Sequence, residues 1–159
     1  MSNDRNPRGL RNNNPLNIRI NPRNNWQGKV AHNTDGAFEQ FETLSDGCRA
    51  ACKLILYYYL HLKLNTIALI VSRWAPPTEN NTSAYIRSVC KRTGFAGEEK
   101  LTPNMLFPVI YAMACVEIGE IHAITIHDAL KKAFQMCIYQ RKQQTLSGSN
   151  PPVLHQRQN

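Results

Sequence analysis

Residues 45–62 read SDGCRAACKLILYYYLHL, and this stretch decides the fold class. Its apolar side chains recur at steps of three and four positions, at Ala51, Leu54, Ile55, Tyr58 and Leu62. That spacing places them on one face of an α-helix, and Ser45 is a suitable N-cap. The sequence therefore predicts a long helix that buries one face in a core.

Four further helices are expected after this one. Their predicted bounds are Thr66 to Trp74, Asn81 or Thr82 to Gly94, Phe107 to Glu117 or Ile118, and Thr125 to about Gln140. Prolines and glycines set these limits, and Pro108 is tolerated at the first helical position. The last helix is expected to bury Leu130, Met136 and Cys137 among its apolar residues. The strand candidates are residues 16–20 and 37–41, so we predict a mainly α fold with a small irregular or β-containing front lobe.

Composition divides the chain into three zones. Residues 1–33 hold ten of the 16 asparagines and six lysines or arginines, with little apolar periodicity, so they are expected to be loop-rich. The tail from Gln143 includes a Ser-Gly-Ser-Asn-Pro-Pro run that is typical of a flexible end. At 159 residues and 42% hydrophobic content, we predict a single domain over residues 1–142, followed by a flexible tail over residues 143–159.

Charge and hydropathy narrow the class of partner and the location. A net charge of +8 favours a polyanion, such as nucleic acid, an acidic cell-wall polymer or an anionic surface. The longest nearly apolar run, residues 54–62, is far shorter than the roughly 20 residues of a membrane span. The first eight residues lack the apolar core of a signal peptide. We therefore expect synthesis in the cytoplasm, no membrane span and no export by the general secretory route.

The cysteines and histidines do not form a recognisable cofactor motif. Five cysteines, an odd number without a Cys-x-x-Cys pair, fall mostly on apolar helical positions, which predicts buried free thiols. The sequence also contains neither a phosphate-binding glycine loop nor a paired-histidine metal motif. We expect no metal and no cofactor.

Glu117 is the first candidate catalytic residue. Ile110, Met113 and Ala114 define an apolar stripe on the predicted fourth helix, and Glu117 continues that stripe at the next helical step. A carboxylate on an apolar face is costly to ionise, which suits a general acid. The alternative is that Glu117 caps a loop or pairs with an arginine.

An asparagine-rich segment, RNNNPLNIR at residues 11–19, is the second candidate feature. Asn13, Asn14 and Asn17 offer donors and acceptors to a ligand rich in hydroxyl and acetamido groups, or they satisfy the loop backbone. Trp26 either provides a platform for a sugar ring or covers a small core.

A second carboxylate opposite Glu117 has several candidates. Glu79 is one of them, although its position before a helix also suits the positive end of the helix dipole. Asp35, Glu39 and Glu42 are the others, and the sequence does not select among them.

Several of these segments resemble a phage and prophage family. They are residues 9–19 (GLRNNNPLNIR), 26–28 (WQG), 35–41 (DGAFEQF), 47–50 (GCRA), 74–82 (WAPPTENNT), 85–86 (YI) and 117–119 (EIG). Family members read R-N-N-N-P-G-N-I-R, W-x-G, G-F-A-x-F and H-E-N-G, and many are described as virion structural proteins. The resemblance covers residues 9 to about 130.

The family's motifs are in turn similar to pieces of lysozyme-like, glycan-cleaving enzymes. The resemblance implies a lysozyme-like helical domain in which the catalytic glutamate follows the asparagine-rich segment instead of preceding it, as in a circular permutation. Two departures stand out. Leu16 replaces the family's glycine, and Val116 and Ile118 replace the polar neighbours of the glutamate. Either change is compatible with weakened or lost activity.

Our first hypothesis is an enzyme that cleaves peptidoglycan glycan strands. Glu117 would protonate the glycosidic oxygen between N-acetylmuramic acid and N-acetylglucosamine, with Glu79 as a second carboxylate if the reaction is hydrolysis. Without a second carboxylate, lytic transglycosylation is favoured. The expected glycan-binding residues are Asn13, Asn14, Asn17, Arg19, Trp26 and Tyr85. The protein would act at the cell wall or in the periplasm, or be packaged in the virion.

The alternative hypothesis is a non-enzymatic virion structural or assembly component that binds glycan or another virion protein. A nucleic-acid-binding module rests on net charge alone, so we do not expect nucleic acid as the partner.

Overall fold

The computed structural model describes residues 5–78, 80–150 and 153–155, and this part of the chain is mainly α-helical, as predicted. The helices are α1 (Arg8–Arg11), α2 (Leu44–Leu60), α3 (Ile67–Trp74), α4 (Thr82–Thr93), α5 (Leu106–Ile118), α6 (Glu120–Ala123) and α7 (His127–Ser147). Short 3₁₀ turns at Pro103–Met105 and Ile124–Ile126 precede α5 and α7.

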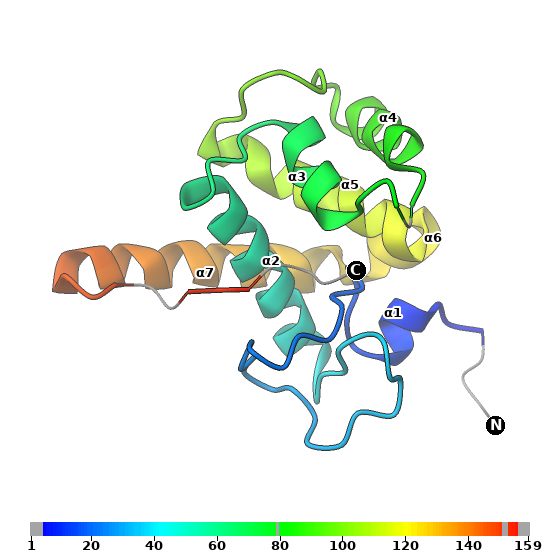
Figure 1. Cartoon of the computed structure of the whole chain (residues 1–159), viewed down its shortest axis with the longest axis vertical. Coiled ribbons are helices and arrows are strands. Elements are labelled where there is room, and N and C mark those ends of the chain that lie inside the picture. The colour runs from blue at the N-terminus through cyan, green and yellow to red at the C-terminus, as the bar shows by residue number, and fades with distance from the viewer. Residues whose placement is uncertain (1–4, 79, 151–152, 156–159) are drawn as a thin grey trace.

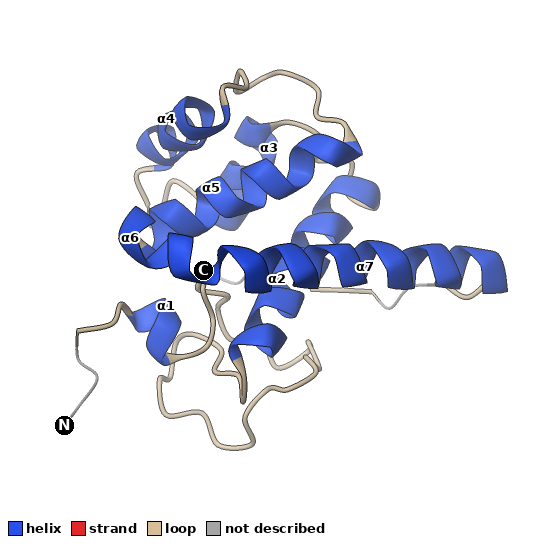
Figure 2. Ribbon diagram, turned by 180° about the vertical axis from the view of Figure 1, so that it is seen from behind, coloured by secondary structure: helices blue, strands red, loops and turns tan. Residues whose placement is uncertain are grey.

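The two longest helices, α2 and α7, cross and pack against each other (Figure 1). Helices α3 to α6 gather on one side of α7, and residues 12–43 form a front lobe on the other side, as both views show (Figures 1 and 2). Helix α1 lies beside this lobe and contacts α5. Helix α1 therefore links the front lobe to α5.

Side-chain caps define the starts of three helices. The Thr43 hydroxyl accepts a hydrogen bond from the backbone nitrogen of Asp46 and begins α2, so the prediction of Ser45 as the cap is wrong by two residues. Thr66 and Asn81 cap α3 and α4 in the same way, which confirms the predicted starts of both helices. Gly94 ends α4 in the left-handed conformation, as expected.

Helix α7 is longer than the sequence pattern indicates. It continues to Ser147, beyond the predicted end near Gln140, and Gly148 then adopts a left-handed conformation with φ of 72°. Met136 is 47% exposed instead of buried. The C-terminal part of α7 projects past the rest of the helical body (Figure 1).

The core lies where α2, α3 and α5 face one another. Trp74 and Tyr58 are fully buried there, with ring centroids 6.1 Å apart in an edge-on arrangement. All five cysteines are free thiols, and four are buried as predicted, whereas Cys90 is partly exposed. Burial raises the pKa of Cys48 to about 12, so this thiol is not reactive.

The front lobe is irregular. Residues 16–20 and 37–41 do lie side by side, but the described residues form only isolated antiparallel bridges, Arg19 with Phe38 and Lys29 with Phe41. The strand prediction is therefore wrong in extent. The Asn14 side chain takes over part of the pairing, because its amide nitrogen donates to the backbone oxygens of Ile18 and Glu39, at 3.0 Å each.

Gly47 allows the front lobe to pack directly on α2. A Cβ atom at Gly47 would overlap the backbone oxygen of Asn13. Any side chain at position 47 would push the asparagine-rich segment away from α2. This steric limit explains why residues 47–50 (GCRA) begin with glycine.

Candidate functional site

Glu117 lies in the last turn of α5. The residue is half-buried, and its Oε2 atom is shielded from solvent. Gly119 follows with φ of 86°, a conformation that ends the helix and redirects the chain into α6. The predicted position of Glu117 at a helix end, on the side that faces the protein, is confirmed.

Asn17 reaches the same end of α5. A Cβ atom on Gly9 of α1 would lie 2.8 Å from Cγ2 of Ile118 and 3.0 Å from Oδ1 of Asn17. Gly9 thus touches both the residue after Glu117 and the Asn17 side chain. The Asn17 oxygen is buried, has no hydrogen-bond partner among the described residues, and sits on a left-handed backbone with φ of 53°.

Tyr85 also contacts α5. This residue of α4 is 8% exposed, and its hydroxyl lies 3.5 Å from the backbone oxygen of Met113, one helical turn before Glu117. The structure therefore brings Glu117, Asn17 and Tyr85, three of the predicted site residues, to the distal half of one helix.

Three other predicted glycan-binding residues have structural roles instead. Asn14 is fully buried, and the Asn13 amide donates to the backbone oxygen of Phe41 at 3.0 Å. Trp26 is 6% exposed and belongs to the core. For these residues the alternative interpretation, in which side chains satisfy the loop and Trp26 covers a small core, is the better one.

Arg19 lies at the rim of the front lobe in a cluster that the sequence analysis did not identify. The guanidinium carbon of Arg8 lies 4.5 Å from the ring centre of Phe38, and that of Arg19 lies 5.0 Å from it. Arg8 also donates to both carboxylate oxygens of Asp35, at 2.7 and 2.6 Å. These bonds hold the pKa of Asp35 well below its usual range, so Asp35 is an anchor for the lobe.

Glu39 is the most deeply buried carboxylate of the described residues. Its Oε1 atom lies 3.4 Å from the Lys29 ammonium and accepts from the Asn21 backbone nitrogen at 3.3 Å. Burial raises the pKa of Glu39, and Lys29 opposes that shift. Glu39 is thus held inside the front lobe. Glu79, the other predicted catalytic carboxylate, lies outside the described residues.

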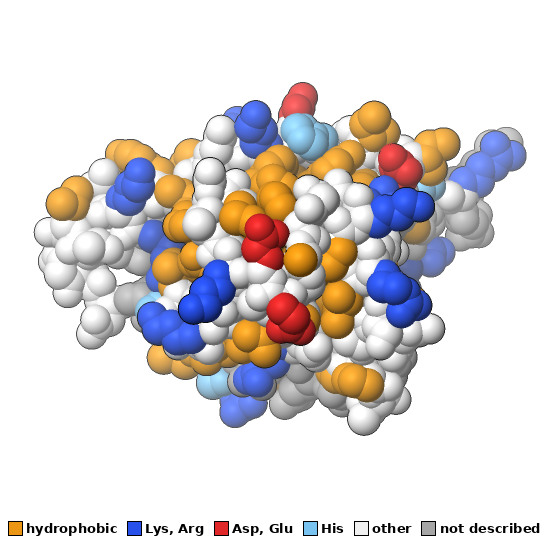
Figure 3. All heavy atoms as spheres, turned by 90° about the horizontal axis from the view of Figure 1, so that it is seen from above, with side chains coloured by type: hydrophobic (Ala, Val, Ile, Leu, Met, Phe, Trp, Pro, Cys, Tyr) orange, Lys and Arg blue, Asp and Glu red, His pale blue; other side chains and the backbone are white. Residues whose placement is uncertain are grey.

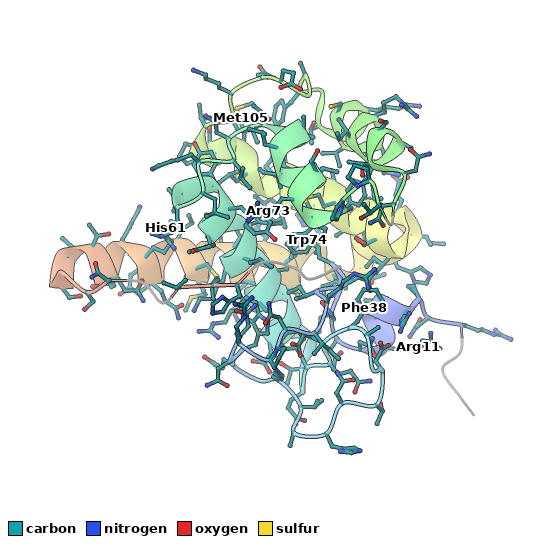
Figure 4. The ribbon with its side chains drawn as sticks, in the orientation of Figure 1. Arg11, Phe38, His61, Arg73, Trp74 and Met105 are labelled. Carbon is teal, nitrogen blue, oxygen red and sulfur yellow. The ribbon has the colours of Figure 1, made fainter. Side chains whose placement is uncertain are left out.

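Arg73 is a partly buried cation that the sequence did not single out as a candidate site residue. It lies in the last turn of α3, and its Nε atom is shielded from solvent without a hydrogen-bond partner among the described residues. Figure 4 shows Arg73 and Trp74 in the middle of the molecule, at the end of α3. In the sequence Arg73 is a basic residue near the C-terminal end of a predicted helix, a common position for an exposed cation, so nothing there predicts its burial.

Metal-binding groups and membrane-spanning helices were sought over the whole described part of the chain. In residues 5–78, 80–150 and 153–155, no three His, Cys, Asp or Glu side chains are grouped closely enough to hold a metal ion. No helix in the described part is long and apolar enough to cross a membrane.

The fold and the site define a mainly α-helical protein with a half-buried glutamate at a helix end. No family model matches the chain. Its sequence is 38% identical over 134 residues to Protein P5 of Pseudoalteromonas phage PM2, a match that covers 83% of this chain and 82% of the relative. The chain belongs to the family of this phage protein.

Proposed function

We propose that this chain is a phage-encoded protein that cleaves peptidoglycan glycan strands, with Glu117 as the general acid. The observation that carries the proposal is the place of Glu117, half-buried at the end of α5 with Oε2 shielded from solvent. In this proposal the Glu117 carboxyl group donates its proton to the glycosidic oxygen as the bond breaks.

The neighbouring groups have complementary roles in this proposal. The buried Oδ1 of Asn17 accepts a hydrogen bond from an acetamido N–H of the glycan. Tyr85 packs against α5 one turn before Glu117 and fixes the helix end that carries the acid. Arg19 contributes at the rim of the lobe, where its guanidinium lies against Phe38.

The type of cleavage depends on a second carboxylate. Asp35 is bound by Arg8, and Glu39 is fully buried beside Lys29, so neither is placed to activate a water molecule at the site. Glu79 and the exposed Glu42 are then the candidates for hydrolysis, and lytic transglycosylation follows if neither has a role. We propose the same circularly permuted, lysozyme-like architecture that the motif order implies, within a single domain.

The phage relative supports packaging in the virion, which also fits the structural alternative given below. For the enzyme, we propose action at the host cell wall or in the periplasm, reached at lysis or from within the virion. The net charge of +8 suits the anionic polymers of a bacterial wall.

Digestion of purified sacculi tests this proposal. We expect wild-type protein to release soluble muropeptides and Glu117→Gln to do so at least about a hundredfold more slowly, since general acids contribute on that scale. Glu120→Gln is the matched control, because Glu120 is exposed and lies three residues further along the chain. Equal rates for wild type and Glu117→Gln would refute the role of Glu117.

A second candidate function is a non-enzymatic virion structural or assembly component. The exposed apolar side chains of α7 favour it, because Tyr139 is 58% exposed and Leu146 is 82% exposed on a projecting helix. In this case Leu146→Asp would lower the amount of the protein in assembled virions, while sacculi would stay intact even with well-folded wild type.

A further inference from the structure

A pair of neighbouring hollows lies between the front lobe and the crossing of α2 with α7. The larger has a volume of about 290 Å³, and Arg23, Arg49 and Lys53 contribute to its lining. The smaller lies along α7, where Arg141 faces Lys53. Lys53 and Leu154 line both hollows.

Positive charge dominates these linings. The described residues that line the two hollows include four cations, Arg23, Arg49, Lys53 and Arg141, and no aspartate or glutamate. Arg49 and Lys53 lie one turn apart on α2, so their charges repel each other. The pKa of Lys53 is lowered by burial, by Arg49 and by Arg141.

No described carboxylate lies within 4.0 Å of Arg49, Lys53 or Arg141 to offset this repulsion. The partner of Arg141 is instead His61, whose Nε2 atom lies 2.7 Å from Nη2 of Arg141. Burial and the nearby cations Arg141 and Lys63 lower the pKa of His61, so this partner is neutral near pH 7. A group of half-buried like charges is costly, and an anionic ligand would remove that cost.

Residues 153–155, here called the C-terminal segment, lie along one side of the larger hollow, which Val153 and Leu154 line. The Asn24 amide donates to the backbone oxygen of His155 at 3.0 Å, and the His155 backbone nitrogen donates to Oδ1 of Asn24 at 2.8 Å. Leu154, the residue before His155, packs against the core. A long polymer would have to displace this segment, so the space fits a small ligand.

We propose that Arg23, Arg49, Lys53 and Arg141 form a binding site for a small soluble ligand with two or more linked phosphate groups. Arginine guanidinium groups bind phosphate oxygens in pairs, and the larger hollow, at about 290 Å³, has room for more than one phosphate. Arg141 adds positive charge from the neighbouring smaller hollow. Gln140 and Gln144 on α7 add amide donors to the smaller hollow. By contrast, the face over α4 in Figure 3 mixes acidic, basic and apolar side chains and offers no continuous basic surface.

Isothermal titration of the full-length protein with inorganic tripolyphosphate tests this site. We expect Arg49→Gln with Lys53→Gln to weaken binding at least about tenfold. The matched control is Lys131→Gln with Lys132→Gln, which removes the same charge from exposed positions of α7 and is expected to change affinity by less than about twofold. Thermal unfolding of each variant confirms that it is folded.

Several outcomes would overturn the proposal. Equal weakening in the two double variants would mean that tripolyphosphate senses only net charge, and absence of binding to folded wild type would exclude the site. Citrate that binds as tightly as tripolyphosphate at equal ionic strength would contradict phosphate selectivity. A short single-stranded DNA that binds more tightly than tripolyphosphate would contradict the small-ligand assignment.

Discussion

The indole nitrogen of Trp74 donates a hydrogen bond to the backbone oxygen of Leu16 at 3.2 Å, and both side chains are fully buried. This contact joins the end of α3 to the asparagine-rich segment across 58 positions of sequence. Leu16 therefore has a structural explanation where the resembled family has glycine, because its side chain extends the core of the helical body into the front lobe.

Leu16→Ala is predicted to lower the free energy of unfolding by about 2–5 kcal/mol, since it removes a fully buried side chain from a packed interface. Urea denaturation measures this change. Leu69→Ala is the control, because Leu69 is 44% exposed on α3 and should change stability far less. Equal losses in the two variants would contradict the anchoring role of Leu16.

Asp35 is predicted to stabilise the fold in a pH-dependent way. Its pKa in the folded protein is depressed, chiefly by Arg8, so its contribution is complete above the unfolded pKa of about 4 and is lost as pH falls further. Asp35→Asn should cost about 1–2 kcal/mol at pH 7, because Arg8 is partly exposed, and the cost should shrink toward pH 2. Unfolding curves across this range test the prediction. A cost that is independent of pH would contradict it, and Glu42→Gln, which removes an exposed carboxylate, is the control.

Lys29 and Glu39 are predicted to be strongly coupled. Lys29→Met should cost about 2–3 kcal/mol at pH 7, because it leaves a buried carboxylate without its cation. Burial raises the pKa of Glu39 in the folded protein, so its ionisation lowers the free energy of unfolding as pH rises above the usual carboxyl pKa. The cost of Lys29→Met should therefore be smallest near pH 4, where Glu39 is protonated. Adding Glu39→Gln should restore most of the loss. A double-variant cycle measures the coupling, and simple additivity would rule it out.

The contact between Asn24 and His155 is predicted to protect the C-terminal segment locally. Asn24→Ala removes both hydrogen bonds to the His155 backbone, so exchange of the His155 amide with solvent should accelerate at least about tenfold. Hydrogen exchange followed by NMR measures this rate. Asn25→Ala, at an exposed neighbouring position, should leave it unchanged. An unaltered rate in Asn24→Ala would show that the contact does not hold the segment.

The helical body could be predicted from the sequence because local signals specify it. Apolar spacing places α2, and the Asn81 cap and Gly94 stop place α4 within a residue or two. The front lobe could not be predicted in this way. Its pairing depends on the Asn14 side chain, which bonds residues 25 positions away, and no local pattern encodes such a contact.

The candidate site was predictable only in part, for a related reason. Glu117 continues an apolar stripe, so its position on the inner side of α5 follows from helical spacing. The asparagines of the same loop look alike in sequence, yet Asn14 is fully buried and Asn17 reaches α5 through the close approach at Gly9. Arg73 gave no signal, because the burial of one guanidinium nitrogen depends on tertiary packing.

The most direct test of the account is mass spectrometry of the muropeptides released from purified sacculi by wild type and by Glu117→Gln. We expect cleaved glycan products from wild type and almost none from a well-folded Glu117→Gln protein. Anhydro ends would assign lytic transglycosylation, whereas reducing ends would assign hydrolysis with a second carboxylate. Intact sacculi after incubation with folded wild-type protein would contradict catalysis by Glu117 and favour the structural role.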